Sequence, residues 1–157
     1  LNTSSTIQEI DEIYLEIQVN ILNKRNMNNK KIDKKNDSLS SYLVLNIDGY
    51  EVLVGKNNKQ NDFITFRVAN KEDIWFHVKD NSGSHVLLRK KTNIDISEEL
   101  LRKCASIAAY YSKCKDSSKV EVQYTTIKFI KKPKNSRPGF VTFSKYNSIM
   151  VEPKRAT

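Results

Sequence analysis

The chain has 157 residues, which is enough for one ordinary domain and an appendage. Its formal net charge of +9 at pH 7 favours polyanionic partners such as nucleic acids. No run of about eighteen apolar residues occurs, so the sequence encodes no transmembrane helix. Cys104 and Cys114 fall in one predicted helix, roughly 15 Å apart and too distant for a disulfide. We therefore expect reduced thiols and a cytoplasmic protein with no bound metal or cofactor.

The N-terminal part of the chain separates into two predicted segments. Residues 1–23 predict a helix, because isoleucines and Tyr14 recur at spacings of three and four along one stripe. Such a stripe needs a partner, which is either another helix or the domain that follows. Residues 24–40 are rich in Asn, Lys, Asp and Ser and predict a basic, flexible linker. The globular domain is expected over residues 41–155, and because the first residue is Leu1 we take the chain to be part of a longer protein.

Two strands open the globular domain. Residues 42–47 and 50–54 are rich in β-forming side chains, and the Asp-Gly pair between them is the strongest short-range hairpin signal. Residues 61–70 also have β propensity, but Phe63 and Phe66 recur at a helical spacing. The Asn-Asp pair at the start of that segment is a good N-cap, so we expect a short helix there.

Residues 73–89 carry the most informative pattern in the chain. Read with a period of two, the first strand of this segment has an apolar face and a functional face: Ile74, Phe76 and Val78 on one, Asp73, Trp75 and His77 on the other. If a second strand pairs antiparallel with His77 opposite His85, Trp75 faces Leu87 and Asp73 faces Arg89. The apolar set, with Val86 and Leu88, should be buried and so enforce this register.

The rest of the domain predicts a helix and further strands. Asp95 to Glu98 reads as a helix start with acids in its first turn, and Lys113 and Lys115 suit the helix end. The expected buried face comprises Leu100, Leu101, Cys104, Ile107, Ala108 and Tyr111. Residues 119–130 alternate as a strand, and residues 140–144 and 149–151 predict a final hairpin. The fold class is therefore α+β, a mainly antiparallel sheet packed with two helices, plus an N-terminal helical appendage.

Basic side chains gather in two stretches. One lies in residues 24–35, and the other contains Lys128, Lys131, Lys132, Lys134 and Arg137 with no acid among them. A solvated surface is the alternative interpretation of any such run. The second stretch is interrupted by Pro and Gly and reads as a loop between β-rich segments, where binding residues commonly gather.

Several ordered motifs resemble the NFACT-R family. They cover roughly residues 40–153 and comprise Val54–Asn58, Gln60–Asp62, Asp73–His77, Gly83–Val86, Ala108–Ser112, Val122–Thr125 and Lys131–Gly139. The chain departs from the family pattern at three positions: Ser82 replaces a usual Pro, Lys56 a common Arg, and Gln123 a common acid.

The resemblance implies an RNA-binding module with no catalytic residues. NFACT-R is the C-terminal domain of bacterial proteins called fibronectin-binding, which are similar to the eukaryotic factors that extend stalled nascent chains on the large ribosomal subunit. The implied partners are tRNA, large-subunit rRNA and ribosomal proteins, with no membrane. The family also has a coiled coil upstream, so residues 1–23 would be the end of that coiled coil and would pair with its other helix. The alternative is a protein-interaction or adhesion module that binds fibronectin or fibrinogen.

The resemblance also implies one composite surface that contacts RNA. Its expected members are Lys56, Asn57, Gln60, Asn61, Asp73, Trp75, His77, Ser84, His85, Arg89, Lys131, Lys132, Lys134 and Arg137. Trp75 and His77 are suited to stacking on an unpaired base, and the lysines to phosphates. The alternatives are that Trp75 covers the sheet beneath a neighbouring element and that the amides of residues 57–61 serve caps and turns.

Catalysis and metal binding are not expected from these residues. Ser84 and His85 are neighbours on an extended segment, so their side chains point to opposite faces and do not form a nucleophile–base pair. Two histidines on adjacent strands more often pack or hydrogen-bond than bind a metal.

Overall fold

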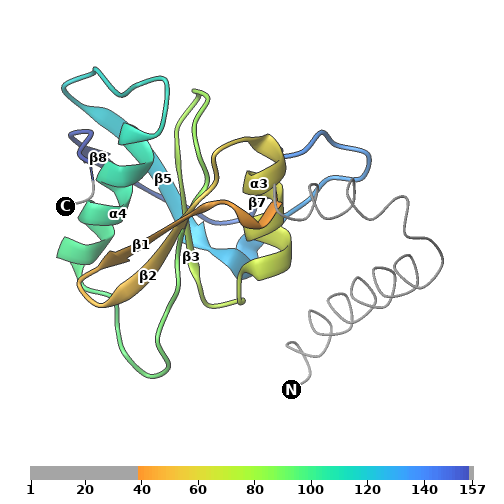
Figure 1. Cartoon of the computed structure of the whole chain (residues 1–157), viewed down its shortest axis with the longest axis horizontal. Coiled ribbons are helices and arrows are strands. Elements are labelled where there is room, and N and C mark those ends of the chain that lie inside the picture. Colours follow the sequence, from red (N-terminus) through yellow and green to blue (C-terminus); the bar gives the residue numbers. More distant parts are fainter. Residues whose placement is uncertain (1–38, 156–157) are drawn as a thin grey trace. The chain divides into compact units, whose positions relative to one another are not determined.

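The computed structural model describes residues 39–155, and its compact unit begins at Tyr42 (Figure 1). The predicted helix over residues 1–23 and nearly all of the predicted linker over residues 24–40 lie outside the described residues.

A six-stranded antiparallel sheet forms the centre of the domain. Its strand order is β1-β2-β4-β3-β5-β8, so the strands at the two edges are β1 and β8. The strands are β1 (Leu43–Ile47), β2 (Tyr50–Val54), β4 (Val86–Leu88), β3 (Ile74–Val78), β5 (Val120–Thr126) and β8 (Asn147–Val151). The first hairpin is confirmed: Asp48 and Gly49 both have positive φ, 54° and 85°, as a type I′ turn requires.

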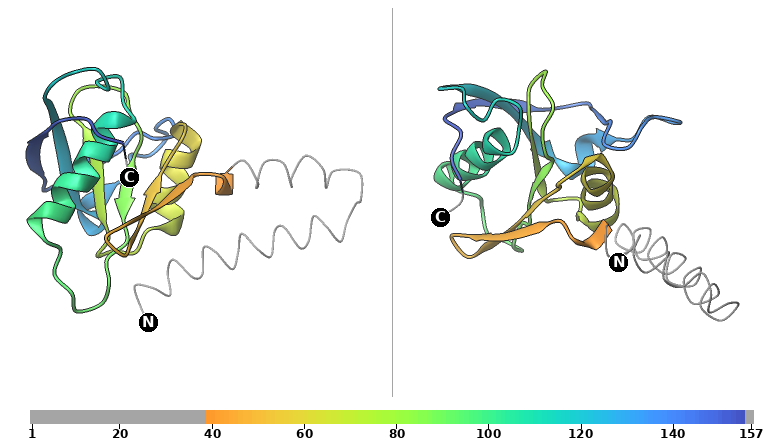
Figure 2. Two further views of the ribbon diagram at one scale, coloured as in Figure 1. Left: turned by 60° about the vertical axis from the view of Figure 1, so that its left-hand side comes forward. Right: turned by 45° about the horizontal axis from the view of Figure 1, so that its top comes forward.

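Helix α4 (Glu98–Tyr110) covers one face of the sheet, as the views in Figures 1 and 2 show. The predicted start is confirmed, because the Ser97 side chain accepts a hydrogen bond from the Leu100 amide at 3.2 Å. The buried side chains of α4 pack against the apolar residues of the central strands, including Phe76, Val78 and Val122. This layer is the main hydrophobic core.

The end of α4 differs from the prediction. The helix stops at Tyr110, because Tyr111 leaves the helical region and the Ser112 hydroxyl donates to the Ala109 carbonyl oxygen at 2.6 Å. Cys114 therefore lies beyond the helix, and the two cysteines do not share one helix as the sequence suggested. Both thiols are free, and burial raises the pKa of Cys104 to about 12.

The opposite face of the sheet is covered by a second layer. It consists of α3 (Asn58–Phe63), the π-helical turn η1 (Ile64–Val68), and a two-stranded ribbon of β6 (Ile130–Lys131) and β7 (Thr142–Phe143), which follows the 3₁₀ turn η2 (Ile127–Phe129). The predicted short helix is confirmed, but it begins earlier, because Asn57 caps it by accepting from the Gln60 amide at 2.9 Å. The fold class is confirmed for the described residues: an antiparallel sheet packed with two α-helices.

The predicted C-terminal hairpin is wrong. The segment around Phe143 pairs with β6, whereas β8 pairs with β5. The reason is burial on the α4 side: Ile149 and Val151 lie beside Val122 and Val120, and this pairing extends the main core. A tight hairpin would have kept Phe143 away from the second layer, where it packs on Trp75.

Candidate nucleic-acid interface

The register predicted for β3 and β4 is confirmed. Trp75 pairs with Leu87, which places His77 opposite His85 and Asp73 opposite Arg89. The two imidazole rings lie 5.4 Å apart between centroids, and Arg89 Nε lies 2.9 Å from Asp73 Oδ2. Alternation over five residues was therefore sufficient to place the functional side chains of both strands on one face.

That face is not an open surface. The exposed fractions are 1% for Asp73 and 2% for both Trp75 and His85. The indole stacks on His77, with ring centroids 5.7 Å apart, and Phe143 of β7 packs on it at the same centroid distance. The structure shows the alternative to base stacking that the sequence left open, because the Trp75 ring covers the sheet beneath neighbouring elements. In this conformation the Asp73 side chain is closed to RNA, and Trp75 and His85 keep only a small exposed area.

Asp73 organises the start of β3 from a buried position. Its carboxylate accepts hydrogen bonds from the Asn70 and Lys90 amides at 2.8 and 2.9 Å and pairs with Arg89. Burial raises the pKa of Asp73, while these hydrogen bonds and the guanidinium oppose the rise. Arg89 also lies 3.9 Å from the exposed Glu51, so the Arg89 guanidinium is held between one buried and one exposed acid.

The two histidines are neutral at pH 7. Burial is the main cause that lowers the pKa of His85 to about 3, followed by the repulsion that would arise if His77 were protonated as well. His85 Nδ1 lies 2.8 Å from the Thr65 hydroxyl, which fixes the imidazole against η1. Burial also lowers the pKa of His77, whose ring is only partly covered. The predicted histidine pair thus supplies uncharged aromatic rings rather than cations.

The amide-rich segment after β2 is mainly structural. Asn61 Oδ1 accepts from the His85 backbone amide at 3.0 Å, and Gln60 Oε1 accepts from the Lys56 amide at 2.9 Å. Both amide side chains are buried. Gly55 is required here, because a Cβ at this position would collide with Asn61 Oδ1 and lie 2.9 Å from the Asn61 backbone nitrogen. The cap-and-turn interpretation therefore holds for Asn57, which caps α3, and the Gln60 and Asn61 amides are likewise used within the fold. Lys56 and Asn57 are exposed.

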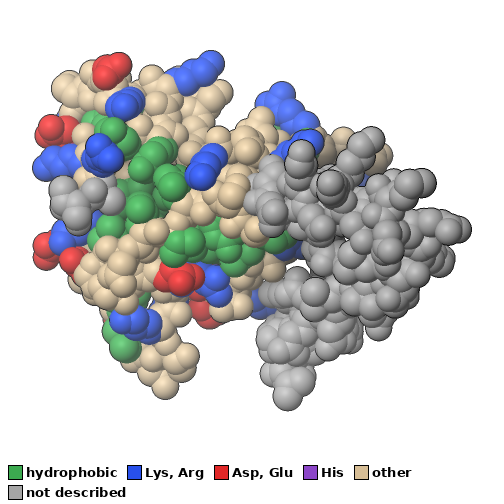
Figure 3. Space-filling model, in the orientation of Figure 1, with side chains coloured by type: hydrophobic (Ala, Val, Ile, Leu, Met, Phe, Trp, Pro, Cys, Tyr) green, Lys and Arg blue, Asp and Glu red, His purple; other side chains and the backbone are tan. Residues whose placement is uncertain are grey.

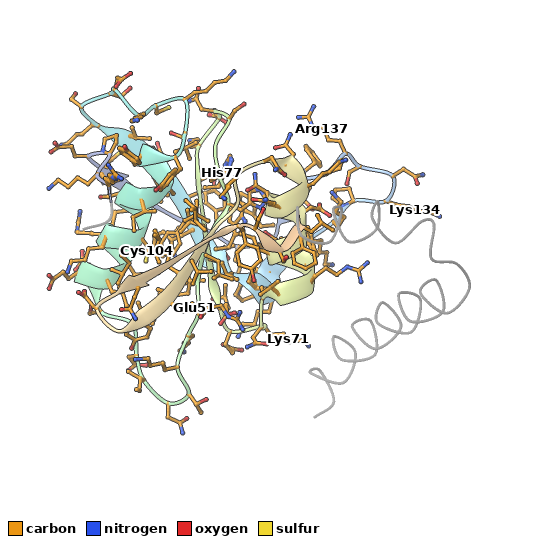
Figure 4. The ribbon with its side chains drawn as sticks, in the orientation of Figure 1. Glu51, Lys71, His77, Cys104, Lys134 and Arg137 are labelled. Carbon is orange, nitrogen blue, oxygen red and sulfur yellow. The ribbon has the colours of Figure 1, made fainter. Side chains whose placement is uncertain are left out.

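The second basic stretch contributes exposed cations from the end of β6 and from the loop that follows it. Lys131, Lys134 and Arg137 are exposed, and Figure 4 shows Lys134 and Arg137 pointing away from the body of the domain. Lys132 is different: its ammonium lies 2.7 Å from Asp62 Oδ1 and donates to the Arg137 carbonyl oxygen at 2.6 Å. Lys132 thus fastens the loop to α3. Figure 3 shows further Lys and Arg side chains spread over the visible face rather than in one patch.

A cleft of about 670 Å³ lies beside this loop and brings several predicted residues together. Asn61, Trp75, His77, His85 and Arg137 all line it. Two further lining residues, Gln123 and Phe143, were not predicted as site residues from the sequence. Alternation along β5 could have predicted Gln123, because Gln123 pairs with His77 and lies on the same face of the sheet. No local pattern marked Phe143, which reaches the cleft through the β6–β7 ribbon.

A second groove, of about 560 Å³, collects other predicted residues. Lys56, Asn57 and Ser84 line it together with Tyr110 and Tyr111. Asn61 and the loop at Gly83 border both hollows. The structure therefore divides the predicted composite surface into two adjacent depressions. Six of the predicted residues line neither of them: Gln60, Asp73, Arg89, Lys131, Lys132 and Lys134.

Other kinds of site are not found in the part of the chain that the structure describes. Within residues 39–155 no group of three or more His, Cys, Asp or Glu side chains is placed to hold a metal ion. In the same range no helix is long and apolar enough to cross a membrane.

Comparison with known proteins gives consistent matches. The family model described as the NFACT protein RNA binding domain matches residues 40–145. The "Rqc2 homolog RqcH" of Bacillus subtilis is 43% identical over 134 residues, which is 85% of this chain and 23% of that protein. The protein of the same name from Streptococcus suis is 40% identical over 95% of this chain and 26% of its own length. "Coiled-coil domain-containing protein 25" of Bos taurus is 32% identical over 68% of this chain and 53% of its own.

A solved structure agrees with the sequence matches. The C-terminal part of the fibronectin/fibrinogen-binding protein from Streptococcus suis superposes with a TM-score of 0.65 and 43% identity, covering 71% of this chain and 44% of that one. The chain spans about a quarter of the length of the RqcH relatives. The match over residues 40–145 covers well over half of the chain, and the chain therefore belongs to the NFACT RNA-binding domain family.

Proposed function

We propose that this domain is a non-catalytic RNA-binding module of a ribosome-associated quality-control factor. The parent factor would bind large ribosomal subunits stalled with peptidyl-tRNA and promote C-terminal tailing of the nascent chain in the cytoplasm. The domain would contact tRNA or large-subunit rRNA. The observation that carries the proposal is the family match over residues 40–145, to a domain described as RNA-binding. The name "Rqc2 homolog" of the RqcH relatives supports the ribosomal setting.

The charge distribution supports an RNA partner. Lys131 ends β6, and Lys134 and Arg137 project from the loop that follows it. Lys132 anchors this loop through Asp62, so the backbone that carries the three cations is fastened. The Gly139 amide adds a second link by donating to Asp62 Oδ1 at 3.1 Å. Exposed cations on an anchored loop suit phosphate contacts, because little ordering is required on binding.

The arrangement of Ser84 and His85 supports a non-catalytic role. His85 Nδ1 is already hydrogen-bonded to the Thr65 hydroxyl, and the imidazole is buried. A general base needs access to the proton that it removes. The residues of this segment serve the architecture of the cleft instead.

Co-sedimentation tests the proposal against adhesion. The 157-residue chain would be centrifuged through a sucrose cushion with purified large ribosomal subunits at a series of salt concentrations, and tested in parallel on immobilised fibronectin. We expect sedimentation with the subunits that weakens steeply as salt rises. Saturable fibronectin binding without association with subunits or tRNA would contradict the proposal and favour the adhesion module.

A further inference from the structure

The cleft beside His77 has a neutral, aromatic floor. Trp75, His77, His85 and Phe143 form a cluster in which each ring contacts at least one other, with centroid distances of 5.1 to 5.7 Å. Because burial keeps both imidazoles uncharged at pH 7, the floor carries no formal charge. A floor of this kind suits a flat, uncharged, polarisable group better than an anion.

The charged side chains that line the cleft also balance. They are Arg137 and Asp80, one cation and one anion. A phosphate inside the cleft would meet as much repulsion as attraction from these two groups. The other two exposed cations, Lys131 at the end of β6 and Lys134 in the following loop, are absent from the lining and remain outside. The charge pattern therefore separates a neutral interior from a cationic exterior.

Two polar groups in the cleft walls lack protein partners. Gln123 is half-buried, and nothing among the described residues hydrogen-bonds its side-chain amide. Trp75 Nε1 is a buried donor that likewise has no partner in the described part of the chain. A buried donor such as this indole N–H is nearly always paired in folded proteins. The Gln123 amide is reached by solvent and is available to a ligand. A free amide offers one acceptor and two donors, which matches the hydrogen-bonding edge of a nucleobase.

We infer that this cleft receives one unpaired nucleobase of a single-stranded RNA segment, with the Gln123 amide hydrogen-bonding the base edge and the phosphates outside on Lys131 and Lys134. The inference rests on the proposed RNA-binding function and deepens it by naming the class of RNA. His77 and Phe143, both partly exposed, provide the rings next to the base. The volume of about 670 Å³ lies within the range of roughly 300–1,000 Å³ typical of ligand pockets. A duplex would not fit, because its bases are stacked and paired.

Binding of matched oligonucleotides tests the inference. The 157-residue chain would be titrated with adenine, cytosine and uracil homo-oligomers of about ten nucleotides, and with an abasic oligomer of the same length. Affinity would be read from the anisotropy of a terminal dye. Emission of Trp75, the only tryptophan in the chain, would report on the cleft itself. Gln123→Leu removes the amide, and Ser148→Ala on the neighbouring strand is the matched control, since Ser148 pairs with Gln123 but does not line the cleft.

We expect at least one base-bearing oligomer to bind roughly 5- to 150-fold more tightly than the abasic oligomer, which corresponds to one stacked base. Only base-bearing oligomers should change Trp75 emission at saturation. Gln123→Leu should lower the affinity for the preferred oligomer by about 2- to 12-fold, which corresponds to one hydrogen bond. The affinity for the abasic oligomer and the unfolding midpoint should stay unchanged. Ser148→Ala should behave as the wild type.

Three results would overturn the inference, and they point to different faults. Equal binding of abasic and base-bearing oligomers by the wild type would refute the base cleft while leaving RNA binding through the loop intact. A base preference that Gln123→Leu leaves unchanged would place the base elsewhere on the domain. Failure of every oligomer, tRNA and large subunits to bind would remove the proposed function and the inference together.

Discussion

Acid should destabilise this domain through His85. The imidazole is neutral in the folded state, where its pKa is about 3, but it takes up a proton near the ordinary value of 6.5 once the chain unfolds. Because protonation stabilises only the unfolded state in this interval, the free energy of unfolding should fall as the pH drops below 6.5. The loss continues until the pH approaches the folded-state pKa, and no further loss from this group occurs below that value.

The magnitude follows from the two pKa values. At about 1.4 kcal/mol for each pH unit below 6.5, the contribution of His85 between pH 7 and pH 5 is about 2 kcal/mol. This is a large part of the roughly 5–15 kcal/mol that stabilises a typical domain. His77 changes stability in the same direction, because burial also lowers its pKa.

Urea denaturation at several pH values measures the effect. The wild type and His85→Gln would be compared between pH 7 and pH 5, since glutamine stays neutral throughout and keeps hydrogen-bonding groups near Thr65. The variant should be less stable at pH 7 but should lose about 2 kcal/mol less on acidification. Other titrating groups are common to both proteins and cancel in the difference. Parallel pH profiles for the two proteins would show that burial does not hold His85 neutral.

Three further changes probe the cleft and its supports. Trp75→Ala should lower the free energy of unfolding by about 3–5 kcal/mol, because it empties a fully packed position; denaturation that matched the wild type would argue against the buried indole. Gly55→Ala should lower the free energy of unfolding by about 1–3 kcal/mol, because the added methyl group displaces Asn61. An unchanged unfolding midpoint would show that the turn accommodates the methyl group without strain. Arg89→Met should lower the free energy of unfolding by about 3–5 kcal/mol, because it leaves the buried Asp73 carboxylate without its cation. A loss below about 1 kcal/mol would mean that the Asn70 and Lys90 amides alone stabilise the carboxylate.

Local periodicity predicted the paired strands well. The alternation around Trp75 determines both which side chains share a face and which register buries the apolar set, and the β3–β4 pairing follows it. The N-cap of α4 at Ser97 was equally readable, because capping depends on a few adjacent residues.

Long-range packing could not be predicted in the same way. The functional face of β3 is covered by Phe143, which arrives from more than sixty residues along the chain through the β6–β7 ribbon. Nothing local distinguishes a tryptophan on an open face from one beneath such a ribbon. The same limit applies to Gln60 and Asn61, because an amide that caps a turn and an amide that binds RNA look alike in sequence. Likewise, nothing in the sequence distinguishes Lys132 from the neighbouring lysines, because its role depends on the ion pair with Asp62 in the folded domain.

The salt dependence of tRNA affinity measures whether Lys131, Lys134 and Arg137 bind RNA phosphates. A triple alanine variant at Lys131, Lys134 and Arg137 would be compared with a matched variant at Lys90, Lys119 and Lys154, which are also exposed and remove the same charge. We predict weaker binding by the triple variant at Lys131, Lys134 and Arg137, with the slope of log K against log salt reduced by about 2–3, and a near-normal slope for the matched variant. Equal losses in both variants, or no loss in the first, would contradict this assignment of the phosphate contacts.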